Sequence, residues 1–220
     1  MYGIPWSDGS GKTGLSPLAK NEHVSHPIVF VHGNGRSASD WECYFGVSPD
    51  DRRLWAITFD NSEVSHQSWA TQLDSFIESL YDHVSFDKIS IVAHSLGVTV
   101  SRLWINQYNN GRFDVDTFVG IAGANDGTSL CAGMLAFPVL PEQLKPCRKL
   151  APQKIASLKK EIGDHDNNVD YYTICGTRDR FFVAQPDSPK LDHATNIEVN
   201  EDHDGARTNC VDLVYNLISI

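Results

Sequence analysis

The sequence has no long hydrophobic run and little positive charge. None of its apolar stretches approaches the roughly 20 residues that a membrane-spanning helix needs. The first six residues do not combine a basic with an apolar region, so we expect any export signal to be absent or already removed. The 18 Lys and Arg residues face 28 Asp and Glu residues, a net charge of −10 that argues against nucleic acid and anionic membrane surfaces as partners.

The five cysteines contain no Cys-x-x-Cys pair of the kind that binds metals. Their number is compatible with two disulfides and one free thiol, which favours a secreted protein. The alternative is a cytoplasmic enzyme in which all five are reduced and buried. The sequence does not determine the pairing among Cys43, Cys131, Cys147, Cys175 and Cys210.

Two short motifs are similar to a nucleotide-binding loop and to a cation site, and we assign neither function to them. The stretch Gly9–Thr13 is similar to a phosphate-binding loop, but Trp6 stands where the first glycine is required and no strand is expected before it. The run Asp164-His165-Asp166 could suggest a cation site, and we interpret it as surface charge. The sequence therefore predicts neither a metal nor an organic cofactor.

From Pro27 onward, apolar runs alternate with segments of helical periodicity. This alternation predicts one α/β domain over residues 1–220, with a mostly parallel sheet of about six strands flanked by helices. Residues 1–26 are expected to be an irregular lead-in, and residues 124–162 a cap or lid. The expected strands are 28–31, 54–59, 89–92, 118–121, 171–175 and 195–199, and the expected helices are 69–80, 98–108, 151–162 and 206–220.

The pentapeptide Ala93-His94-Ser95-Leu96-Gly97 lies between an expected strand and an expected helix. A serine at such a sharp turn is lifted out of the sheet, and its neighbours must be small for strand and helix to approach closely. Gly97 is small, and Ala93 adds only one methyl group to the usual glycine. The pattern is typical of a nucleophile elbow and predicts acyl hydrolysis or transfer at Ser95.

A serine nucleophile needs a base and a carboxylate that orients it, which follow it along the chain in the order acid, then histidine. Asp179 comes directly after the strand at 171–175, and His203 lies between the last strand and the closing helix. We therefore assign Asp179 as the acid and His203 as the base. The alternatives are Asp126, which also follows a strand, and His193, which precedes the last strand and should lie at the opposite edge of the sheet.

The loop His32-Gly33-Asn34-Gly35 directly follows the first expected strand. Glycine allows such a loop to turn so that a backbone N–H faces a developing negative oxygen. The residue after the nucleophile supplies the other donor in this type of site. We therefore predict that the backbone N–H groups of Asn34 and Leu96 form an oxyanion hole.

With these motifs in place, the chain from Pro27 onward resembles the α/β-hydrolase superfamily, in particular small bacterial lipases and lipase-like polyhydroxyalkanoate depolymerases. Alanine in the first position of the elbow is frequent in those lipases, and the His-Gly-Asn-Gly loop is similar to that of the depolymerases. The resemblance implies the α/β-hydrolase fold and the roles given above to Ser95, His203 and Asp179. It does not extend to residues 124–150, the segment that sets substrate choice in such families.

We expect a substrate that is a neutral aliphatic ester, cleaved by a monomer through an acyl-enzyme. Aromatic and apolar side chains expected near the mouth of the site favour an uncharged acyl chain. The alternatives are a polyester depolymerase, an acyltransferase or thioesterase, and a non-catalytic binding protein on the same scaffold. The candidate substrate contacts are Trp41, Met134, Leu135, Phe137 and Phe181.

Overall fold

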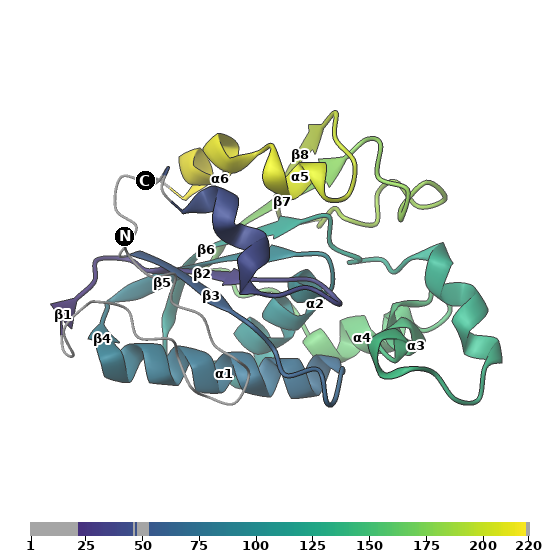
Figure 1. The fold of residues 1–220 in the computed structure, drawn as a ribbon, viewed down its shortest axis with the longest axis horizontal. Coiled ribbons are helices and arrows are strands. Elements are labelled where there is room, and N and C mark those ends of the chain that lie inside the picture. Colours follow the sequence, from purple (N-terminus) through teal and green to yellow (C-terminus); the bar gives the residue numbers. More distant parts are fainter. Residues whose placement is uncertain (1–21, 46, 48–52, 219–220) are drawn as a thin grey trace.

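The computed structural model describes residues 22–45, 47 and 53–218, and a six-stranded parallel sheet runs through the middle of this part (Figure 1). The phosphate-loop-like stretch and most of the expected lead-in lie outside the described residues. The strand order is β3-β2-β5-β6-β7-β8, and every neighbouring pair is parallel. The strands are β2 (Ile28–Val31), β3 (Leu54–Ile57), β5 (Lys88–His94), β6 (Asp114–Ile121), β7 (Asp170–Gly176) and β8 (Thr195–Val199).

All six predicted strands are confirmed, with ends shifted by a few residues. Strands β2 and β3 are buried along their whole length, as expected for strands covered on both faces. Strand β8 lies at the edge of the sheet and is largely exposed. A two-residue pair outside the main sheet, β1 (Glu22–His23) with β4 (Val84–Ser85), was not predicted because so short a run has no periodicity.

Helices cover both faces of the sheet. Figure 1 shows α1 and α2 on one face, and α5 and α6 on the other. A 3-10 helix, η1, packs against β2 and β3 and was not predicted. The helical elements are η1 (Ala38–Tyr44), α1 (His66–His83), α2 (Leu96–Leu103), η3 (Trp104–Tyr108), η4 (Ser129–Ala136), η5 (Glu142–Leu144), α3 (Cys147–Leu150), α4 (Ile155–Ile162), α5 (Gly205–Thr208) and α6 (Val211–Leu217).

The helices have identifiable caps, and several of their ends differ from the predicted ones. The backbone N–H of Ser68 donates to the hydroxyl of Ser65, which caps α1. Helix α2 continues into η3, a π-helical turn, so the segment expected as one helix has two hydrogen-bonding patterns. The helix expected at the C-terminal end is divided into α5 and α6, and α4 begins four residues later than expected.

The expected cap region is made of short helices with little regular structure between them, at one end of the sheet (Figure 1). A disulfide joins Cys131 to Cys147 and ties η4 to α3. Cys43, Cys175 and Cys210 are free thiols, so the structure forms one disulfide where the number of cysteines allowed two. No helix in the described part of the chain is long and apolar enough to cross a membrane.

Candidate active site

Ser95 stands alone between β5 and α2, in a backbone conformation that few residues other than glycine adopt. Its φ and ψ angles are 55° and −122°. This geometry costs free energy, and the structure maintains it because β5 and α2 are both packed into the core. The predicted strand-to-helix turn is therefore present, and the strain is of the kind that a nucleophile elbow stores.

The backbone around Ser95 is packed so closely that two glycines cannot be replaced without a shift. A Cβ on Gly97 would lie 2.6 Å from the carbonyl oxygen of His32 and 2.7 Å from that of Val31. A Cβ on Gly33 would lie 2.8 Å from the Cβ of Ser95. The loop after β2 therefore lies directly against the elbow, a contact that the sequence analysis did not predict.

Asp179, which is buried, and His203, which is partly buried, form a pair at the same edge of the sheet as Ser95. The Nδ1 atom of His203 lies 2.6 Å from Oδ2 of Asp179. The other carboxylate oxygen of Asp179 accepts the backbone N–H of Phe181 at 2.8 Å, so both oxygens are engaged. Because a carboxylate only accepts, Nδ1 of His203 carries the shared hydrogen and Nε2 is left as the basic atom.

The loop that carries His203 comes close to the end of β7. A Cβ on Gly176 would lie 2.6 Å from the carbonyl oxygen of Glu201, and the N–H of Arg178 donates to the same oxygen at 3.0 Å. Arg178 also binds the carbonyl oxygen of Asn200 through its guanidinium. Arg178 therefore holds the histidine loop and leaves the carboxylate of Asp179 to His203.

His94 connects this pair to the elbow, a contact that the sequence analysis did not predict. Its ring centroid lies 4.7 Å from that of His203, and its Nε2 donates to the backbone carbonyl of His203 at 3.0 Å. Burial holds the pKa of His94 well below 6.5, so the ring is neutral at neutral pH. Since His94 directly precedes Ser95, its contact brings the His203 loop to the side of the serine.

The described residues contain no hydrogen bond between the Ser95 hydroxyl and His203. In substrate-free hydrolases this contact is often long, and it tightens when substrate binds. Ser95, His203 and Asp179 therefore converge on one edge of the sheet, with the histidine and the acid already joined and the serine held beside them through His94.

The predicted oxyanion donors flank the elbow. Leu96 is the first residue of α2, where a backbone N–H has no acceptor in the helix itself. Asn34 lies in the loop that presses on Ser95, and its side-chain amide donates to the carbonyl oxygen of Gln143 in the cap at 2.6 Å. On the other side of the same loop, Arg36 bonds to Asp204, the residue after His203, at 2.6 Å.

The candidate substrate contacts divide into three groups by burial. Trp41 was wrongly assigned, because its side chain is fully buried between Phe30 and Tyr44 and offers no surface to a ligand. Met134 and Leu135 are partly buried in η4. Phe137 and Phe181 are about half exposed, and the Phe181 ring lies 4.3 Å from that of His203.

The alternative acid and base lie elsewhere. Asp126 pairs with Lys159 of α4. The ring of His193 stacks on that of His165, with centroids 3.6 Å apart. Neither residue contacts the elbow in the structure.

The comparisons with known proteins agree with this architecture. The sequence profile of the lipase (class 2) family matches residues 25–185, nearly three quarters of the chain. The chain belongs to the class 2 lipase family. The matched part of this class 2 lipase contains Ser95 and Asp179, and it ends before His203. Family membership makes it a hydrolase that acts on esters and confirms the resemblance to α/β-hydrolase lipases.

Solved structures of similar fold include a lipase, BlEst2, from Bacillus licheniformis in its mature form. That protein is 17% identical, with a TM-score of 0.69 over 92% of this chain and 95% of its own. The lin2722 gene product of Listeria innocua is 16% identical, with a TM-score of 0.62 over 89% and 94% of the two chains. A metagenomic carboxyl esterase, MGS0156, is 18% identical, with a TM-score of 0.61 over 91% and 72%. These likenesses confirm the α/β-hydrolase fold of the class 2 lipase.

Proposed function

We propose that this class 2 lipase hydrolyses neutral aliphatic esters through an acyl-enzyme formed on Ser95. The observation that carries the proposal is the 2.6 Å pair of His203 and buried Asp179, set beside a serine in a strained turn. A serine hydroxyl is a weak nucleophile at neutral pH and needs an oriented base to react. This pair supplies the orientation.

In the proposed reaction, Nε2 of His203 accepts the hydroxyl proton as Ser95 Oγ attacks the ester carbonyl carbon. The carbonyl π electrons move to oxygen, and the N–H groups of Asn34 and Leu96 stabilise the resulting negative charge. The C–O bond to the alcohol then breaks, and His203 returns its proton to the leaving oxygen. Water repeats the sequence on the acyl-enzyme and releases the carboxylic acid.

An exposed apolar rim supports the choice of an uncharged acyl chain as substrate. The large hydrophobic side chains exposed in the cap and in the loop after β7 are Leu130, Phe137, Val139, Leu144, Phe181 and Val183. Phe181 belongs to this rim and also contacts the His203 ring. Phe181 therefore places apolar surface beside the reacting groups, and burial of an acyl chain against it would be favourable by roughly 25 cal/mol for each Å² of apolar surface buried.

The proposal is tested with nitrophenyl esters of rising chain length and an aliphatic polyester, using the wild type and Ser95→Ala. We expect turnover of the neutral esters in the wild type and none above background in the variant. A fluorophosphonate should label the wild type at Ser95 and leave the variant unlabelled. Undiminished turnover in the variant would reject the mechanism, while the chain-length profile separates an esterase, a lipase and a depolymerase.

We further propose that the enzyme works outside the reducing cytoplasm. The disulfide between Cys131 and Cys147 supports this location, since such bonds persist in oxidising compartments. Mass spectrometry of the protein purified from its native source, alkylated without reduction, should find both cysteines unmodified by the reagent. Alkylation of both cysteines in that sample would contradict the proposal.

A further inference from the structure

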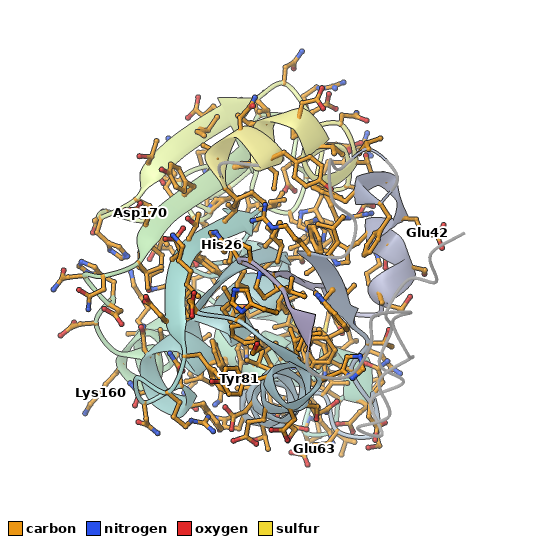
Figure 2. The ribbon with its side chains drawn as sticks, turned by 90° about the vertical axis from the view of Figure 1, so that its left-hand side faces the viewer. His26, Glu42, Glu63, Tyr81, Lys160 and Asp170 are labelled. Carbon is orange, nitrogen blue, oxygen red and sulfur yellow. A yellow bond between two sulfur atoms is a disulfide. The ribbon has the colours of Figure 1, made fainter. Side chains whose placement is uncertain are left out.

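A cleft of about 470 Å³ that is separate from the proposed active site, and is named the second cleft here, lies between α2, α4 and the segment that leads into β8. None of the residues that line it belongs to the proposed active site. Figure 2 shows the side of the molecule on which Lys160, at the rim of this cleft, and Asp170, at the start of β7, both lie. Three features of this cleft point to a ligand.

The first feature is a buried cation. Arg102 of α2 lines the cleft and is only 6% exposed. Its Nη1 donates to the side-chain oxygen of Asn125 at 2.9 Å, and the amide of Asn125 in turn donates to the carbonyl oxygen of Pro189. Asn125 is neutral, and within the described ranges no carboxylate lies at ion-pair distance from the guanidinium. A guanidinium has five N–H donors, so most of this group's donors remain for another acceptor.

The second feature is the balance of charge around that cation. Three lysines and three aspartates line the cleft, so their charges cancel. Lys159 is bonded to Asp126, and Lys190 is bonded to Asp187 and Glu198. Burial lowers the pKa of Arg102 and the nearby Asp126 raises it in part, but the carboxylate of Asp126 is bonded to Lys159 and not to the guanidinium. A buried charge without an ionic partner is costly, and an anion bound there would reduce that cost.

The third feature is a wall built from two imidazoles. The rings of His165 and His193 are stacked with an angle of 8° between their planes, and the rings of His193 and Tyr171 are nearly perpendicular, with centroids 5.0 Å apart. Both histidines line the cleft. Burial lowers the pKa of His193, and the neighbouring His165 and Arg102 lower it further. The His193 ring is therefore neutral at neutral pH and offers an N–H group to the cleft.

We propose that this cleft binds a small oxyanion, a carboxylate or a phosphate group, on the guanidinium of Arg102. A planar guanidinium matches two oxygens of either group with two parallel hydrogen bonds, which no lysine at the rim can do. The site is separate from Ser95, although Arg102 lies on the helix that begins directly after that serine. The inference does not depend on the proposed reaction.

Isothermal titration calorimetry at constant ionic strength tests the proposal with two probes, inorganic phosphate and acetate. The wild type and Ser95→Ala should bind at least one probe saturably and with equal affinity, and the better probe distinguishes a phosphate site from a carboxylate site. No saturable binding of either probe would overturn the proposal. Binding that is lost in Ser95→Ala would also overturn it, because the ion would then occupy the proposed active site.

Three variants locate the ion. Arg102→Gln should weaken binding roughly tenfold or more, since a charge-assisted contact is lost. Lys160→Gln, at the exposed rim, should weaken it about two- to threefold through the loss of one nearby charge. Lys154→Gln is the matched control, because Lys154 is an exposed lysine directly before α4 that does not line the cleft. It should bind as the wild type does.

Circular dichroism shows whether Arg102→Gln is folded. If it is folded and binds the probe like the wild type, the proposal fails. If it does not fold, the comparison of Lys160→Gln with Lys154→Gln decides. Equal affinities in these two variants would overturn the proposal, and a loss confined to Lys160→Gln would support it.

Discussion

The molecule contains two pairs of histidines in ring contact, and their surroundings differ. His94 and His203 lie at the elbow, where Asp179 binds one ring and a backbone carbonyl binds the other. His165 and His193 stack more closely, at the edge of the second cleft. In the described part of the chain the latter pair has no carboxylate hydrogen-bonded to either ring. The proposed base, His203, therefore differs from His193 in its contact with the buried carboxylate of Asp179 and not in having a second ring beside it.

Replacing one histidine of each pair, His203 or His193, should give the largest difference in activity between the two regions. We expect His203→Ala to reduce kcat for a nitrophenyl ester by about 10⁴-fold or more, because the proposed base is removed. His193→Ala, the matched control, should retain at least half of the wild-type activity. Steady-state kinetics measure both. Similar losses in the two variants would contradict the assignment of the base.

Removing the carboxylate of Asp179 should give the next largest loss of kcat. Asp179→Asn keeps the size of the side chain, but its amide can donate to the imidazole and favour the wrong tautomer. We expect kcat to fall by roughly 10³- to 10⁴-fold, with the protein still folded by circular dichroism. Asp126→Asn, whose carboxylate pairs with Lys159, should change kcat less than threefold. An active Asp179→Asn variant would show that His203 is oriented by some other group.

His94 should have a smaller effect because it acts through the loop of His203. His94→Phe keeps a ring against His203 but removes the donor to its backbone carbonyl. We expect kcat to fall roughly ten- to a hundredfold, since small displacements of a reacting group have effects of this size. KM should change little. The corresponding change in the other pair, His165→Phe, should leave kcat unaltered, and an equal loss there would indicate a general packing defect.

The smallest expected effect is on the pH dependence of the free energy of unfolding. Burial lowers the pKa of His66 to about 3 and that of His32 to about 4, so both rings are neutral in the folded state. In the unfolded chain these histidines bind protons near pH 6.5. Their contribution to the free energy of unfolding is therefore fully present above that pH, and it is lost as the pH falls toward the lowered pKa values of the folded state. Each group contributes up to about 1.4 kcal/mol per pH unit.

Urea denaturation between pH 7.5 and 4.5 measures this dependence. His66→Gln should reduce the slope of the free energy of unfolding against pH by the contribution of one bound proton. His193→Gln should flatten it less, because His193 is exposed and its pKa is lowered less by burial. An equal slope in wild type and His66→Gln would show that His66 does not titrate on unfolding.

The elements predicted well are those whose signal is local. Strand β2 is a run of β-branched and aromatic residues, β5 contains Ile89, Ile91 and Val92, and the turn at Ser95 needs only small neighbours. The elements predicted poorly depend on remote partners. Trp41 was expected near the mouth of the site as an aromatic contact for an acyl chain, yet in η1 its ring packs on Phe30. The single disulfide likewise depends on which cysteines η4 and α3 bring together.

The amino-acid sequence by itself determined the alternation of strands and helices, the elbow at Ser95, and the order of serine, acid and histidine along the chain. These features follow from short-range sterics and from the period of apolar residues, which need no knowledge of distant contacts. Only the tertiary structure decided that Asp179 and His203 are hydrogen-bonded and that His94 binds the backbone of the His203 loop. The tertiary structure also decided that Arg102 is buried with no carboxylate bonded to its guanidinium among the described residues. Those facts depend on how residues far apart in the chain pack together, and no local pattern encodes a distance.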